Sequence, residues 1–168
     1  MTKAYRSADE QELLSVRNLE RRIANLERAA SGIVHLQAPV TTDVTITATT
    51  SGTAQDLTGA SISIVRPGLY IVLGFFDMEW TVASAGTIAI GQLAVTGGTI
   101  TYARVPLLEC LGTATRATIS DYWTATFTGA GTLRLQAYKS AAAGTLTCKG
   151  QSSGAGSGVL VAIRTGPA

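Results

Sequence analysis

Residues 63–72 read Ser63-Ile64-Val65-Arg66-Pro67-Gly68-Leu69-Tyr70-Ile71-Val72, and they encode two β-strands joined by a turn. Polar and apolar residues alternate before the turn, with the period of two that is typical of a half-buried strand. The Arg-Pro-Gly step is a turn signal. Residues 69–80 after the turn are almost continuously apolar, as expected for a strand that is buried on both faces.

The same alternation recurs along the rest of the chain after Pro39. Alternating segments occupy residues 44–47, 87–90, 124–127, 132–136 and 146–148. Glycine-containing turn signals separate them at residues 84–86, 96–98, 129–131 and 154–158. Eight to ten short strands at regular spacing, without long helices, predict a mainly β protein with a sandwich or jelly-roll head.

The composition of the 168-residue chain excludes several classes of protein. Only 14% of the residues are charged and 46% are hydrophobic, which excludes a disordered chain. A net charge of +2 is too small to attract the phosphates of nucleic acid strongly, so we expect no nucleic-acid binding. No apolar stretch is long enough to span a bilayer, so we expect no membrane insertion. A head of this size needs neither a metal nor a disulfide to fold.

The charged residues are concentrated at the N-terminus, where the apolar spacing also changes. Residues 1–28 contain eleven of the twenty-four charged side chains. From residue 16 onward, the spacing between apolar residues alternates between three and four. This is a heptad pattern, in which the apolar residues occupy the a and d positions and form a narrow seam. These positions are Val16, Leu19, Ile23, Leu26, Ala30 and Ile33. The pattern predicts a short coiled-coil stalk over residues 13–34.

The flanks of this heptad favour a parallel trimer. Arg22 lies at a g position and Glu27 at the following e position, so a parallel neighbour can pair them. The run from Arg22 to Glu27 resembles the Arg-h-x-x-h-Glu trimerisation signature of three-stranded coiled coils. We therefore expect a homotrimer, while a dimer and a helix packed on its own chain remain as alternatives. About two and a half heptads would be marginal alone, so the rest of the chain must help hold the trimer together.

Three segments of the predicted head together resemble the tumour-necrosis-factor-like jelly roll. Residues 63–72 are similar to the strand–Pro-Gly-x-Tyr–strand signature of that family. Residues 132–137 and 157–163 are similar to its penultimate and closing strands. The resemblance implies the fold that is shared by the trimeric globular heads of complement and short-chain collagens. The calcium-ligand aspartates of the family have no clear counterpart here.

The whole arrangement also resembles small minor tail or fibre proteins of tailed bacteriophages. Those proteins often begin with a short coiled coil of the type Leu19-Glu20-Arg21-Arg22 and end in a Thr- and Gly-rich β head. The resemblance implies a virion structural protein that is made in the host cytoplasm without a signal peptide. We expect residues 1–12 to contact other virion proteins, 35–43 to form a linker and 44–168 to form the head.

Two functions fit this arrangement. The first is attachment to a glycan or protein of the host surface by a homotrimeric tail fibre. The second is a capsid head fibre or decoration protein without a specific receptor. No base, nucleophile and stabiliser are placed together in the sequence, so we expect no enzyme, no cofactor and no metal site.

Few individual residues carry a chemical signal. His35 is interpreted as a solvated linker residue; the alternative is a ring of three histidines around a trimer axis. Asp77 and Glu79 point to one face of a strand, where a solvated edge or an inter-subunit ion pair is expected more often than glycoside chemistry. Cys110 and Cys148 are expected to be buried thiols, although a disulfide is the alternative.

Exposed aromatic side chains on β heads often stack on sugar rings. The candidate ligand-binding residues are Trp80, Tyr102, Tyr122 and Trp123. Tyr122 and Trp123 follow the polar run 118–121, which is interpreted as a loop. The alternative is that these aromatic residues pack in the core or between subunits.

Overall fold

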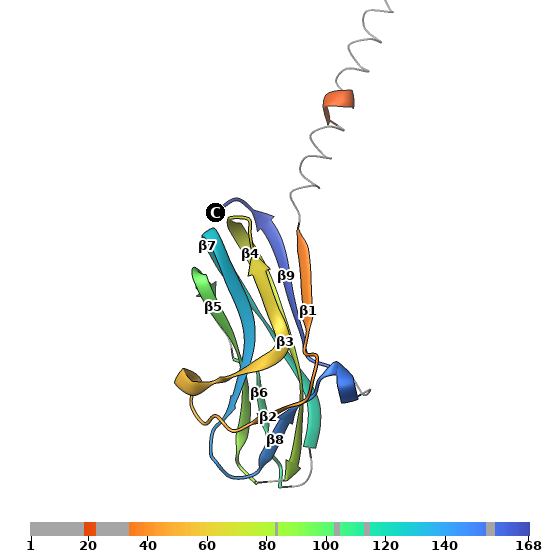
Figure 1. Cartoon of the computed structure of the whole chain (residues 1–168), viewed down its shortest axis with the longest axis vertical. Helices are drawn as coiled ribbons and strands as arrows, with labels where there is room; N and C mark the ends of the chain where they lie inside the picture. The colour runs from red at the N-terminus through yellow and green to blue at the C-terminus, as the bar shows by residue number, and fades with distance from the viewer. Residues whose placement is uncertain (1–18, 23–33, 83, 103–104, 113–114, 154–156) are drawn as a thin grey trace, which may run out of the picture. The chain divides into compact units, whose positions relative to one another are not determined.

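A computed structural model describes residues 19–22, 34–82, 84–102, 105–112, 115–153 and 157–168 of the chain (Figure 1). The chain divides into two compact units, Met1–Ile33 and Val34–Ala168. In the first unit, residues 19–22 are helical and exposed, including the predicted stalk residues Leu19 and Arg22. The other predicted stalk positions lie outside the described residues: Val16, Ile23, Leu26, Glu27, Ala30 and Ile33. No described helix is long and apolar enough to cross a membrane.

The second unit, here called the head, is built from β-strands and two short 3-10 helices. The strands are β1 (His35–Pro39), β2 (Val44–Ile46), β3 (Gln55–Ile64), β4 (Gly68–Val82), β5 (Ile88–Tyr102), β6 (Leu107–Glu109), β7 (Thr115–Lys139), β8 (Thr145–Cys148) and β9 (Val159–Gly166). The 3-10 helices are η1 (Ser51–Thr53) and η2 (Gln151–Ser153). The turn predicted at residues 66–68 lies between β3 and β4, and the mainly β head was correctly predicted.

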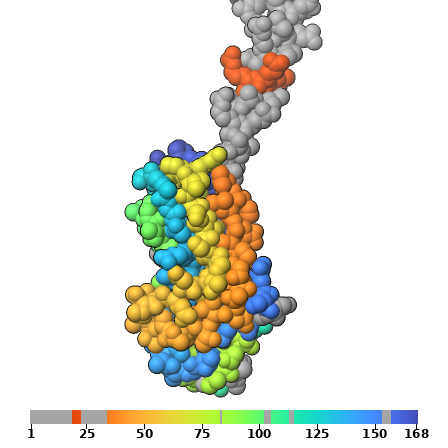
Figure 2. All heavy atoms as spheres, in the orientation of Figure 1, coloured from red at the N-terminus to blue at the C-terminus, as the bar shows by residue number. Residues whose placement is uncertain are grey.

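The strands form one antiparallel sheet that curls into two facing layers (Figure 1). Its main order is β1-β9-β4-β7-β5-β6, with β3 added on β7 and β8 joining β2 to β4. The first half of β7 pairs with β4, and the second half pairs with β3. Figure 2 shows β7 in cyan between β5 in green and the yellow residues of β3 and β4. Strand β7 therefore belongs to both layers.

Two predicted turns are wrong because β5 and β7 bend there without ending. Residues 96–98 lie inside β5, and residues 129–131 lie inside β7. The pairing of the two strands shifts register between Thr96 and Gly98, where Gly97 has a φ of 74°. Glycine tolerates this left-handed backbone conformation, so the strand forms a bulge and continues into the other layer.

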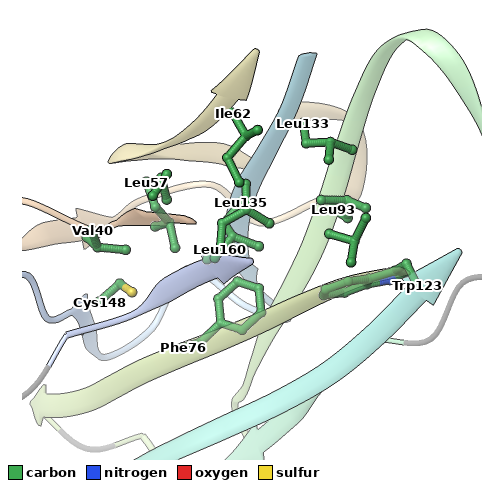
Figure 3. Packing of buried hydrophobic residues seen from close by; sticks show 14 of the residues in the cluster. Val40, Leu57, Ile62, Phe76, Leu93, Trp123, Leu133, Leu135, Cys148 and Leu160 are labelled. Atoms are coloured by element: carbon green, nitrogen blue, oxygen red, sulfur yellow. The ribbon is translucent and has the colours of Figure 1, made fainter. Parts of the chain in front are cut away.

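The core lies between the two layers (Figure 3). Every second residue of β4 from Tyr70 to Trp80 points into it and is fully buried or nearly so. Two pairs of aromatic rings meet edge to face: Tyr70 with Phe127 at 5.6 Å, and Phe76 with Trp123 at 6.5 Å between ring centroids. Such pairs add to the stabilisation from buried apolar area. The core extends from β4 to the Leu133 and Leu135 side chains of β7.

The predicted linker at residues 35–43 is part of the head. Its residues 35–39 form β1, which pairs with β9 from His35 opposite Ile163 to Pro39 opposite Val159. Ala38 is buried and Val40 is fully buried, so this segment contributes to the core. The head therefore begins at Val34 rather than at residue 44. His35 is an exposed strand residue and not part of a free linker.

Candidate functional site

The outward face of β4 carries apolar side chains in its first half. Leu69, Ile71 and Phe75 alternate with the core residues and retain 37–39% of their surface exposed. The prediction that this strand is buried on both faces is therefore wrong for the single chain. The apolar side chains on the outward side of the strand are not covered by another layer of the same chain.

Neighbouring strands extend this apolar surface on both sides. On β9, Ile163 lies opposite Ile71 and Val161 lies opposite Leu73, both half-buried. On β7, Tyr122 lies opposite Leu73 and is 45% exposed. We call this surface the apolar face; its members are Leu69, Ile71, Leu73, Phe75, Tyr122, Val159, Val161 and Ile163. A contiguous apolar patch on an otherwise polar surface marks an interaction site.

The second half of the same β4 face carries charges. The Arg116 guanidinium donates two hydrogen bonds to the Asp77 carboxylate, at 3.0 and 2.7 Å. The Lys149 ammonium lies between two carboxylates, 2.8 Å from Asp43 and 3.2 Å from Glu79. This ion-pair cluster joins the strands β4 and β7 to the residues that flank β2 and β8.

The neighbours of Asp43, Arg116 and Lys149 stabilise the charged form of each of these three groups. The pKa of Asp43 is lowered, first by the hydrogen bond from the Gly150 backbone N–H at 2.8 Å and then by Lys149. The pKa of Arg116 is raised, chiefly by its hydrogen bonds to Asp77. The pKa of Lys149 is raised by Asp43 and then by Glu79. A cluster arranged in this way holds the strands together and favours the ionised form of Asp43.

The placement of Asp77 and Glu79 corrects the sequence-based interpretation. Strand β4 lies inside the sheet rather than at an edge, and Asp77 is 5% exposed. Both carboxylates find their cationic partners within the same chain. In the described part of the chain, no three His, Cys, Asp or Glu side chains gather in a way that could hold a metal ion.

Burial removes two of the four candidate ligand-binding aromatic residues. Trp80 is 0% and Trp123 is 1% exposed, so neither ring can stack on a ligand. Residues 118–121 belong to β7 and not to a loop, which is why Trp123 points inward and Tyr122 outward. Tyr102 ends β5, and its side chain lies outside the described residues. Tyr122 therefore remains, as a member of the apolar face.

The two cysteines are buried free thiols. The Cys110 sulfur accepts a hydrogen bond from the Ser84 backbone N–H at 3.3 Å. Burial raises the pKa of the Cys148 thiol to about 12, and the nearby Asp77 and Asp43 charges act in the same direction. Cys148 is therefore a protonated, unreactive side chain of the core at neutral pH.

A small open hollow lies where β1 approaches the turn between β3 and β4. Its volume is about 230 Å³, and it is lined by Val34, Leu36, Ser63, Val65, Arg66 and Tyr70. The Tyr70 hydroxyl donates a hydrogen bond to the Arg66 carbonyl at 2.7 Å, which fixes the turn at the floor of the hollow. Its size is below the usual range for small-molecule sites.

Sequence reasoning missed the apolar face because it predicts that residues 69–80 are buried on both faces and treats Tyr122 only as a candidate ligand-binding residue. The alternation of residues along β4 already contained the information, because alternate residues of a strand point to opposite sides. Tyr70, Val72 and Phe76 share one side of β4, whereas Leu69 and Ile71 share the other. Because both sides of this strand are apolar, the alternation alone does not tell which side packs against the opposite layer.

Comparison with known proteins shows the fold. No family model matches the sequence, and no curated protein matches it. The structure is similar to Eiger TNF from S. frugiperda, with a TM-score of 0.50 and 12% identity over 82% of this chain and 95% of that chain. It is also similar to the globular domain of zebrafish complement 1qA, with a TM-score of 0.44 and 7% identity over 76% of this chain and 94% of that one. The likeness to Eiger TNF supports the jelly-roll head that the sequence predicts.

Proposed function

We propose that this chain is a structural protein of a bacteriophage virion, a homotrimeric tail fibre or minor tail protein whose heads attach to the host surface. The apolar face is the observation that carries this proposal. In a single chain its residues Leu69, Ile71 and Phe75 of β4 are exposed, and apolar residues of β9 and Tyr122 of β7 lie beside them.

Two further copies of the head are the occupants that fit the apolar face best. The heptad over residues 13–34 with Arg22 and Glu27 favours three parallel chains, so the stalk would bring three heads together. A stalk of this length is marginal by itself and requires contact between the heads. Burial of Leu69, Ile71 and Phe75 between heads would supply that contact through the hydrophobic effect.

The virion role rests on the resemblance of the whole chain to small phage fibre proteins. The run Leu19-Glu20-Arg21-Arg22 lies in the predicted stalk, and a Thr- and Gly-rich β head follows it. Residues 1–12 would contact other virion proteins. Three heads on one stalk would multiply weak single contacts with the host through avidity.

Light scattering on the purified full chain tests the assembly. We expect a mass of about three times the 17.4 kDa of one chain at micromolar concentration. A monomer at that concentration would overturn the proposed architecture. Immunogold labelling of phage particles then tests the location, and label at the tail tip is the expected result.

A capsid head fibre or decoration protein is the second candidate function. The burial of Trp80 and Trp123 favours it, because it leaves the head without an exposed tryptophan for a receptor. Immunogold label over the capsid, together with a trimer that binds no host surface component, would establish this alternative.

A further inference from the structure

The layer opposite the apolar face presents a row of polar side chains across three strands. Asp56 of β3 lies opposite Gln136 of β7, which lies opposite Gln92 of β5. Arg134 precedes Gln136 by two residues and therefore shares its face of β7. We call these four residues, together with Tyr138, the polar platform.

Hydrogen bonds among its members hold the polar platform in one geometry. Arg134 donates to the Asp56 carboxylate at 2.6 Å, and the Gln136 amide donates to its other oxygen at 2.7 Å. The Gln92 amide donates to the Gln136 carbonyl oxygen at 2.8 Å and to the Ser51 backbone carbonyl at 3.2 Å. Side chains ordered in advance lose less conformational entropy when a ligand binds.

The polar platform keeps hydrogen-bonding capacity for a ligand. Arg134 uses one of its guanidinium nitrogens in the contact with Asp56, and each Asp56 oxygen has a second lone pair. Among the described residues, the carbonyl oxygen of the Gln92 side chain has no hydrogen-bond donor. Donors and acceptors thus lie side by side on a partly exposed surface, which suits neighbouring hydroxyl groups, since each hydroxyl both donates and accepts.

One edge of the polar platform, along β7 and β5, is apolar. Tyr138 is two residues beyond Gln136 on the same face, and its register partner is Ile90. Ile90 in turn lies opposite Leu107 of β6, which is exposed. Arg134, Gln136 and Tyr138 together cover about 13 Å of strand. The surface therefore combines an aromatic ring with ordered polar groups.

We infer that the polar platform binds an uncharged oligosaccharide, with the sugar hydroxyls on Asp56, Arg134 and Gln92 and a sugar ring against Tyr138. The charges of Asp56 and Arg134 cancel, so the platform does not select an anionic ligand. An extended protein surface with few large apolar side chains is a poor match for a protein partner, whose interface has an apolar centre.

The ligand site is accessible in the proposed trimer. The apolar face lies on the outward side of the β4 layer, whereas the polar platform lies on the outward side of the β3–β7–β5 layer. Contact between heads through the apolar face leaves the platform in solvent. The inference rests on the proposed function in one respect: it names the ligand class and the surface through which the fibre attaches to its host.

A glycan array probed with the full-chain protein tests the inference. We expect retention of one or more neutral oligosaccharides. The best-retained oligosaccharide is then titrated in solution against variants, so that avidity does not contribute. Tyr138→Ala is expected to weaken binding about fivefold, whereas Tyr138→Phe keeps the ring and is expected to bind like wild type.

A second pair of variants tests the polar half. Gln92→Ala is expected to weaken binding about fivefold, because it removes the carbonyl oxygen that accepts from the ligand and the amide that holds Gln136 in place. Gln151→Ala is the matched control, because Gln151 is an exposed glutamine of η2 outside the platform. Circular dichroism on each variant confirms that the head is folded.

Two outcomes would overturn the inference: no neutral glycan is retained on the array, or Tyr138→Ala and Gln92→Ala both bind like wild type. Light scattering on the same samples separates this failure from failure of the proposed function. A trimer without glycan binding overturns the ligand assignment alone, and a monomer overturns the proposed fibre whether or not the platform binds sugar.

Discussion

Gly74 lies directly beneath the indole ring of Trp123, and no larger residue fits there. A Cβ atom at this position would lie 2.6 Å from the Trp123 ring and 3.0 Å from Leu135. We expect Gly74→Ala to lower the free energy of unfolding by about 1–3 kcal/mol, because Trp123 must shift in a densely packed core. Urea denaturation measures the change.

Gly52→Ala is the control for that substitution. Gly52 lies in η1 with no atom within 4 Å of the position of an added Cβ. Its alanine variant is expected to unfold close to the wild-type midpoint. Equal stability of Gly74→Ala and Gly52→Ala would contradict the close packing of Trp123 on β4.

Asp43 makes the stability of the head depend on pH. Its pKa is lowered in the folded chain by the Gly150 N–H and Lys149, from an ordinary value of 3.8. A lowered carboxyl pKa stabilises the fold above that ordinary value, and the stabilisation is lost as the pH falls through the folded pKa. We expect Asp43→Asn to be less stable than wild type at pH 7.

The difference between Asp43→Asn and wild type should shrink as the pH falls below 3.8. Thermal unfolding of both proteins between pH 7 and pH 2 measures it. A difference that stays constant across this range would mean that ionisation of Asp43 contributes nothing to the stability of the folded head.

At the scale of the strand, β4 divides its two faces between the core and the proposed neighbours in the trimer. Phe75→Glu places a charge on the apolar face without entering the core, since Phe75 is 37% exposed in the single chain. We expect this variant to shift the protein from trimer toward monomer, because three buried charges oppose assembly. Sedimentation velocity measures the distribution, and circular dichroism should remain that of wild type.

Leu111→Glu is the matched control for Phe75→Glu. Leu111 is a more exposed apolar residue that lies outside the apolar face. Its glutamate variant should assemble like wild type. If both variants assemble fully, contact through the apolar face is not required for the trimer.

The strands of the head were largely predictable from the sequence, but their continuity was not. Local alternation located β2 and parts of β3, β5 and β7, because half-buried strands repeat with a period of two. Glycines at 97 and 131 mark turns in most sequences. Here Phe127 packs against Gly98 and Gly131, so the two strands bend around its ring and continue. That outcome depends on tertiary packing, which local sequence does not encode.

The surfaces of the head were harder to predict than its strands. Trp123 and Tyr122 are adjacent aromatic residues. The first is buried and the second exposed only because adjacent residues of β7 point to opposite sides of the strand. The polar platform joins residues from 56 to 138 through pairing between strands that are distant in the sequence, and no single local segment contains all of them. Such surfaces become visible only when the register is known.

At the scale of the whole molecule, stalk and head are expected to share the work of assembly. Ile23→Asp would place three charges in the predicted seam of the stalk and should weaken the trimer. Light scattering over a range of protein concentrations measures this effect. If Ile23→Asp assembles like wild type, the head alone holds the chains together and residues 13–34 are not the trimerising element.

The strand that both layers share has a consequence for how the head opens. Because β7 pairs with β4 in one layer and with β3 in the other, separation of either β4 or β3 from β7 breaks contacts of the same strand. Neither layer is then an independent foldon. Amide protons of β3 and β4 should exchange with deuterium at one common free energy, so a head pulled at its N-terminal end would resist as a single mechanical unit up to global unfolding.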